Sequence, residues 1–211
     1  MRSISIYLEG GGDAAGARAV LRRGMDAFLQ PLKQAARDKA LRWKLVACGP
    51  REEAYRGFLN AIDNSDGDEV TVLLVDAEGP VNRSAVEHLR NRDNWDFRLA
   101  YDSGVQLDDV VHLMVQTMET WIVADPHTLS AYYGQGFRTS SLPQAQNLET
   151  VAKIDVADRL REATRQTQKG SYHKVNHASD LLRLIDAGSV KGRCRHCRLL
   201  FEKLGQLFEA A

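Results

Sequence analysis

The chain has 211 residues, enough for one large domain or for a domain with a small appendage. Hydrophobic residues make up 44% and charged residues 27% of it, the balance of an ordinary globular protein. The absence of any run of about 18 apolar residues excludes a membrane-spanning helix, and three cysteines do not form a secreted disulfide framework. The N-terminus has no continuous apolar stretch of the kind found in a secretory signal, so we expect a cytoplasmic protein.

The formal net charge is zero, but the charges are segregated along the chain. Residues 60–129 contain fourteen acidic and four basic side chains, and residues 159–211 contain eleven basic and five acidic ones. An acidic centre suits cations, whereas a basic C-terminal part suits phosphates or an acidic partner. Solvated helix surfaces explain the basic part equally well.

The first half of the chain alternates strand and helix patterns. Residues 4–8 predict a strand that ends at three consecutive glycines, and residues 13–40 predict one long helical segment with Asp13 as its N-cap. Residues 43–48 predict the second strand and residues 51–62 the second helix. Residues 70–75 are nearly all aliphatic, as in a central parallel strand that is buried on both faces.

The second half is richer in helices. A helix over 83–91, a strand over 110–115 and short helices over 119–124 and 126–133 precede a polar loop at 134–147. Further helices are expected at 148–167, 178–186 and 195–207. We therefore predict an α/β fold with a central parallel or mixed sheet flanked by helices. Residues 1–135 would form the core, and residues 136–211 a helical C-terminal extension packed on it.

Three acidic residues follow predicted strands. Glu9 comes directly after the first strand, and Asp76 and Glu78 come after the third. Ligands of parallel α/β sheets bind outside the carboxyl ends of the strands, so these carboxylates would meet if the two strands are neighbours. Carboxylates with no sulfur or imidazole among them favour Mg²⁺ or Mn²⁺. Separate roles as loop or helix caps are the alternative.

The glycines and an arginine near the same edge suggest a place for phosphate. Gly10, Gly11 and Gly12 let the backbone turn sharply and approach a ligand closely. The helix that follows them would attract an anion at its N-terminus. No Gly-Lys-Ser/Thr follows, so the segment is not a P-loop. Arg51, after the second strand, would neutralise phosphate charge.

The motifs Tyr7-Leu8-Glu9-Gly10 and Asp76-Ala77-Glu78-Gly79, with the α/β rhythm between them, resemble the Toprim domain of topoisomerases, primases and OLD-type nucleases. Toprim domains have a glutamate after the first strand and an Asp-x-Asp pair after a later one. They bind Mg²⁺ to make or break phosphodiester bonds. Here Glu78 replaces the second aspartate, which keeps the ligand chemistry but changes its reach.

The whole chain is also similar to a bacterial family of unknown function, domain of unknown function 4276, which has a Toprim-like core. The matching segments include residues 7–13, 47–49, 74–80 and 112–121. Members of that family often occur beside ATPases in what look like phage-defence loci. The resemblance therefore implies a Toprim-like fold and a partner ATPase.

Further candidates lie beyond the third strand. The resemblance to OLD-type nucleases makes Glu119, and after it Asp125, candidates for a second metal, although Asp125 before Pro126 is equally well explained as an N-cap. Lys169 and Lys174 belong to a loop, residues 169–177, that mixes cations with an aromatic side chain. Such a loop could bind a phosphate backbone, with Lys174 preferred, or it is a basic surface loop.

These residues predict a Mg²⁺-dependent phosphoryl-transfer enzyme, foremost a nuclease that acts on nucleic acid. Glu9, Asp76 and Glu78 would hold the metal, Glu9 is also a candidate general base, and Lys174 would neutralise phosphate charge. The first alternative is a regulatory subunit that binds an ATPase without cutting, which the neutral net charge favours. The second is a phosphohydrolase of small nucleotides, which would need an enclosed pocket rather than an open groove.

Overall fold

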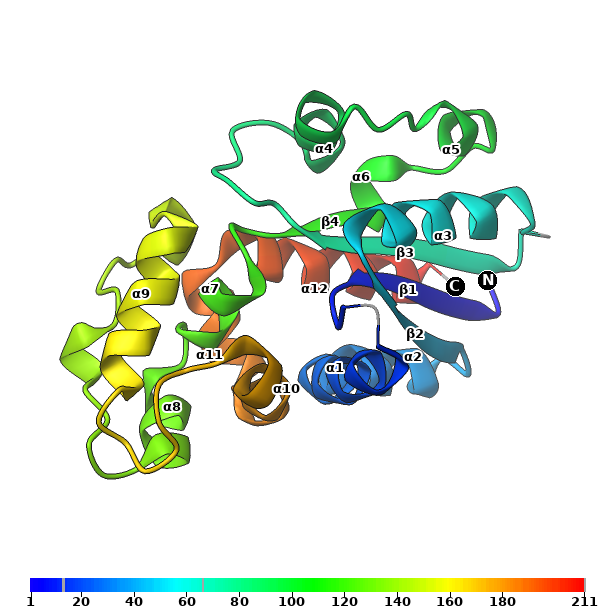
Figure 1. The fold of residues 1–211 in the computed structure, drawn as a ribbon. Helices are drawn as coiled ribbons and strands as arrows, with labels where there is room; N and C mark the ends of the chain where they lie inside the picture. The colour runs from blue at the N-terminus through cyan, green and yellow to red at the C-terminus, as the bar shows by residue number, and fades with distance from the viewer. Residues whose placement is uncertain (13, 66, 211) are drawn as a thin grey trace.

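A computed structural model describes residues 1–12, 14–65 and 67–210 of the chain, so the N-cap role expected for Asp13 lies outside the described residues. The centre of the fold is a four-stranded sheet in the order β2-β1-β3-β4, in which every neighbouring pair is parallel (Figure 1). The predicted α/β class is confirmed, with a parallel rather than a mixed sheet. The strands are β1 (Ser3–Glu9), β2 (Arg42–Gly49), β3 (Glu69–Asp76) and β4 (Val111–Met114).

The two inner strands, β1 and β3, lie side by side over most of their length. Leu8 is paired with Leu74 in the parallel register, one step before Glu9. The last six residues of β3 are all buried, as expected for an inner strand with helices on both faces. Because all four strands run in one direction, their carboxyl ends meet at the same edge, and the acidic residues that follow β1 and β3 lie there.

Helices cover both faces of the sheet (Figure 1). One face is covered by α1, α2 and the C-terminal α12, and the opposite face by α3, α4 and α6, with α5 packed on α3. The bounds are α1 (Ala15–Phe28), α2 (Gln30–Asp38), α3 (Arg51–Asp63), α4 (Ala85–Asp93), α5 (Arg98–Asp102), α6 (Leu107–Val110) and α12 (Arg195–Glu209).

The single helical segment expected over residues 13–40 is wrong in detail, because it consists of two helices. The chain leaves the first helix at Leu29, and α2 begins at Gln30 with Pro31 in its first turn. Proline has no backbone N–H and fits the first turn of a helix better than its interior. Leu29 is completely buried, so the break keeps the apolar positions of both helices on the sheet.

The remaining helices lie beyond the carboxyl ends of the strands (Figure 1). Two predicted starts are corrected: the helix expected from 148 begins at Lys153, after a separate 3₁₀ turn, and the helix expected from 178 begins at Lys174. None of the helices among the described residues has the length and apolar character needed to cross a membrane. The bounds are α7 (Met118–Ile122), α8 (Pro126–Tyr133), η1 (Thr139–Ser141), η2 (Leu148–Thr150), α9 (Lys153–Thr164), α10 (Lys174–Leu184) and α11 (Ala187–Arg193).

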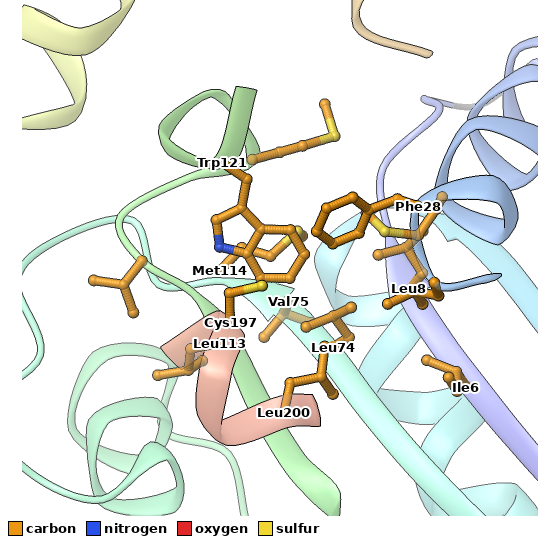
Figure 2. Close-up of a cluster of buried hydrophobic side chains, with 14 of the residues drawn as sticks. Ile6, Leu8, Phe28, Leu74, Val75, Leu113, Met114, Trp121, Cys197 and Leu200 are labelled. Carbon is orange, nitrogen blue, oxygen red and sulfur yellow. The ribbon is translucent and has the colours of Figure 1, made fainter. Parts of the chain in front are cut away.

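The hydrophobic core joins the sheet to helices from both ends of the chain (Figure 2). Phe28 at the end of α1 contacts Trp121 of α7, with ring centroids 5.3 Å apart, and Phe201 of α12, at 6.1 Å. Leu74 of β3 and Leu200 of α12 belong to the same buried cluster (Figure 2). The C-terminal helices therefore pack on the sheet and share its core.

A close contact between α1 and α10 sets the position of the C-terminal helices next to the sheet edge. Gly24 of α1 faces Ser179 of α10, and a Cβ atom at Gly24 would lie 2.6 Å from the Ser179 carbonyl oxygen. Only a residue without a side chain allows this approach. Since α10 begins with Lys174, the same contact determines where that lysine lies.

We expect Gly24→Ala to lower the free energy of unfolding by about 1–3 kcal/mol, because the added methyl group overpacks the α1–α10 contact. Gly16→Ala is the matched control, since Gly16 is in the same helix and a Cβ there meets no atom within 4 Å. That control should raise stability by up to about 1 kcal/mol through helix propensity. Urea unfolding of both variants measures the difference, and equal behaviour would contradict the packing argument.

Candidate metal centre

The three carboxylates expected to converge do so. Glu9, Asp76 and Glu78 each place an oxygen so that the three atoms lie within 4.8 Å of one another. Glu9 is the last residue of β1 and Asp76 the last residue of β3, and these strands are neighbours in the sheet. Among the described residues, this is the one group of His, Cys, Asp and Glu side chains close enough to share an ion.

Arg51, the first residue of α3, holds Glu9 in place. Its Nη1 donates to Oε2 of Glu9 at 2.9 Å and also to the carbonyl oxygen of Asp76. The other side of the guanidinium donates to both carboxylate oxygens of Asp93, at 3.0 and 2.7 Å, and the group lies over the ring of Trp95. These contacts favour a positioning role for Arg51 over the phosphate contact expected from the sequence.

Glu9 is bound through one of its two oxygens. Oε2 accepts from Arg51 and from the backbone N–H of Asp76, the latter at 3.0 Å. Burial raises the pKa of Glu9, although Arg51 and the Asp76 N–H oppose the shift. Among the contacts of the described residues, both bonds to Glu9 go to Oε2, which leaves Oε1 for a ligand.

Asp76 is the most deeply buried member of the group, with 5% of its surface exposed. Its Oδ1 accepts from the backbone N–H of Met118 at 2.8 Å, and its Oδ2 lies 3.9 Å from Nζ of Lys174. Burial raises the pKa of Asp76 to about 8, and the charges of Glu9 and neighbouring acids add to the shift that Lys174 opposes. A divalent cation would relieve the same repulsion without protonation.

Lys174 lies between Asp76 and Glu119, the residue that was a candidate ligand of a second metal. Its Nζ lies 3.4 Å from each oxygen of Glu119, which is buried and also accepts from the hydroxyl of Tyr172 at 3.2 Å. Burial lowers the pKa of Lys174, but Asp76 and Glu119 outweigh it and the pKa is raised overall. Glu119 therefore reaches the group through Lys174 rather than as a fourth close carboxylate.

Glu78 follows the strand in a left-handed backbone conformation, with φ of 64°. Its N–H donates to the carbonyl oxygen of Gln116 at 2.7 Å, and its carboxylate is paired with Lys153, the first residue of α9. Lys153 was not predicted as a partner of Glu78, because it lies 75 residues away in the chain. An exposed lysine at a helix start carries no local signal of such a partner.

Asp125 has the capping role that was the alternative to metal binding. It is the N-cap of α8, where its oxygens accept from the N–H of Thr128 at 3.1 Å and the hydroxyl of Thr128 at 2.6 Å. Its Oδ2 also accepts from the backbone N–H of Asp186 at 2.9 Å. Asp125 does not belong to the close group of carboxylates, so the structure favours the cap.

The glycine turn connects β1 to α1 at the same edge. Gly10 has φ of 117°, and a Cβ there would lie 2.8 Å from a methyl group of Leu21. Its N–H donates to the carbonyl oxygen of Gly49 at 2.8 Å, so that amide is committed to the backbone. A phosphate contact from this turn would therefore use Gly11 and Gly12, which line a cavity beside the carboxylates.

Lys169, the other cation expected to contact phosphate, lies over the ring of Tyr132, with Nζ 4.7 Å from the centroid. Its side chain is exposed and follows α9 rather than beginning α10. The structure brings Lys174 to the carboxylates and gives Lys169 an aromatic partner instead.

The fold and the site define this chain as a parallel α/β protein with an acidic cluster at the carboxyl edge of its sheet. A family model described as Domain of unknown function (DUF4276) matches residues 8–205, and the chain belongs to that family. No curated protein and no solved structure matches it.

If the acidic cluster binds a divalent ion, Mg²⁺ or Mn²⁺ will raise the melting temperature of the wild-type protein. Ligand present at about 100 times its dissociation constant adds about 2.7 kcal/mol to stability. Asp76→Asn should abolish this rise, whereas Asp102→Asn, which removes the same charge from an exposed position of α5, should retain it. Differential scanning fluorimetry measures the shifts. Equal shifts in melting temperature in all three proteins would contradict metal binding by this cluster.

The raised pKa of Asp76 predicts a pH dependence of the chelator-treated protein. Because the folded-state pKa of Asp76, about 8, lies above its ordinary value of 3.8, protonated Asp76 favours the folded state. Its contribution is present at low pH and is lost as pH rises from about 4 to about 8. Relative to Asp76→Asn, the wild type should thus lose stability over this interval and change little above it. Urea unfolding from pH 5 to 9 tests the sign, and a constant difference contradicts it.

Proposed function

We propose that this protein is a Mg²⁺- or Mn²⁺-dependent phosphoryl-transfer enzyme that hydrolyses phosphodiester bonds of nucleic acid. The observation that carries the proposal is the convergence of Glu9, Asp76 and Glu78 within 4.8 Å at the carboxyl edge of a parallel sheet. Oxygen ligands of this type suit hard divalent ions. The resemblance of these motifs to Toprim domains supports the same chemistry.

Each residue of the site would have its own role in the reaction. Glu9, Asp76 and Glu78 would hold the ion, which supplies Lewis acidity and positive charge when bound. Lys174, held by Glu119 at 3.4 Å, would neutralise charge that develops on the phosphate. Arg51 would keep Glu9 in position through its 2.9 Å hydrogen bond.

One observation favours a second function, that of a regulatory subunit which does not cut. The acids of the site are already paired: Glu9 with Arg51, Glu78 with Lys153, and both Asp76 and Glu119 with Lys174. Internal pairing of this kind stabilises the site without a metal. The family resemblance would place such a subunit beside an ATPase in phage defence.

A cleavage screen separates the two functions. We expect wild-type protein with Mg²⁺ or Mn²⁺ to cut at least one of single-stranded DNA, duplex DNA, RNA or transfer RNA. Asp76→Asn should lower the rate by roughly 100-fold or more, and Lys174→Ala by about 10²–10³-fold, because each removes charge complementarity to the transition state. Gel electrophoresis of labelled substrates measures the rates.

Asp102→Asn is the matched control for the change of charge, since it should cut at the wild-type rate. Full activity in Asp76→Asn would remove the carboxylates from the reaction. Co-purification with an ATPase, and no cleavage of any substrate with either metal, would establish the regulatory function instead.

A further inference from the structure

A cavity of about 510 Å³ opens directly beside the carboxylates, and its lining combines charged and aliphatic side chains. The charged part of the lining consists of Glu9, Asp76, Glu78 and Lys174, the groups already proposed for metal and phosphate. The aliphatic part comes from α1 and α10, the two helices that meet at Gly24. A ligand that fills this cavity would therefore contact both charged and apolar groups.

The aliphatic part of the lining, called the wall below, consists of side chains that form no hydrogen bonds. Two of them, Val20 at 37% and Val175 at 70% exposure, are among the few large aliphatic residues exposed to solvent in the described chain. Apolar surface that continues into a charged site commonly marks a ligand-binding position. The aliphatic side chains of this wall are Ala17, Val20 and Leu21 from α1, and Val175 and Ala178 from α10.

The size and the charge of the cavity narrow the choice of ligand. A volume of about 510 Å³ lies within the range of pockets for small ligands, roughly 300–1,000 Å³, and has room for one nucleoside. Lys174, which lines the cavity, and the nearby Arg51 and Lys153 each already pair with a carboxylate. A phosphodiester, with a single negative charge, is therefore accommodated more readily than the multiple charges of a free nucleoside polyphosphate.

We propose that this cavity binds one nucleoside of a nucleic acid strand, with its base against the wall of α1 and α10. The inference rests on the proposed function for the charged part of the lining, since the phosphodiester of the same nucleotide would then reach the carboxylates. Val20 and Val175 become covered when the base binds.

The character of the wall also determines specificity. Reading a base requires hydrogen-bond donors and acceptors that face its edge. The aliphatic residues of the wall offer none, and the polar Ser179 at its margin is only 9% exposed. Recognition is therefore by apolar contact, and the four bases should bind with affinities within about threefold of one another.

The test measures binding of a short single strand, made as DNA and as RNA, in which one abasic residue is placed at each position in turn. Ca²⁺, which also prefers oxygen ligands, replaces Mg²⁺ during the titration. Burial of about 60 Å² of apolar base surface corresponds to about a tenfold gain in affinity. We expect one position at which loss of the base weakens binding by about that factor, and smaller effects elsewhere.

Two variants alter the aliphatic wall, and one control variant leaves it unchanged. Ala17→Phe fills the cavity from a half-buried position of α1, and Val175→Asp places a charge at an exposed position of α10. Both should bind the intact and abasic strands equally. Ala15→Phe, also on α1 but outside the cavity lining, should keep the tenfold difference. Unfolding midpoints near that of the wild type show that the variants fold.

The outcomes separate this inference from the proposed function. If no position depends on its base while metal still raises the melting temperature and cleavage still requires Asp76, the nucleoside site is wrong and the enzyme proposal stands. Free mononucleotides that bind as tightly as the strand would overturn the strand as occupant and favour a phosphohydrolase of small nucleotides. Binding of neither strand nor mononucleotide overturns the inference directly.

Discussion

Mutual repulsion among the carboxylates at the carboxyl edge of the sheet constrains which charged groups must lie beside them. Two unit charges about 4 Å apart repel by about 4 kcal/mol at an effective dielectric constant of about 20. The protein holds three such groups within 4.8 Å and buries Asp76 almost completely. Such an arrangement persists when Asp76 is protonated, when a cation binds, or when other parts of the chain supply compensating charges and hydrogen bonds.

The compensation comes from helices that are distant in sequence. Arg51 comes from the start of α3, Lys153 from the start of α9, and Lys174 from the start of α10. Of these, α9 and α10 belong to the C-terminal helices, and α10 is held against α1 at Gly24. The C-terminal helices are consequently part of the site as well as of the core.

The same compensation bears on function. In the structure the cations balance the acids, which stabilises the fold but also occupies the groups that chemistry would use. Within the proposed enzyme, a divalent ion would take over the balance at Asp76 and leave Lys174 facing the phosphate. Within a regulatory subunit, the pairing would simply persist. The apolar wall of α1 and α10 next to this edge favours a ligand with both charge and apolar surface.

Local patterns in the sequence determined the strands, most of the helices and the positions of the acids at strand ends. The aliphatic run of β3 and the helical spacing in α1 and α3 depend on neighbours a few residues away, so they can be read directly. The strand order that makes β1 and β3 neighbours, and so brings Glu9 to Asp76, was decided only by tertiary packing. Tertiary packing also pairs Glu78 with Lys153 and Arg51 with Asp93. It places Asp125 as the N-cap of α8 rather than among the close carboxylates. Long-range pairings of this kind leave no periodic trace in the sequence, because the free energy that selects them comes from the complete core.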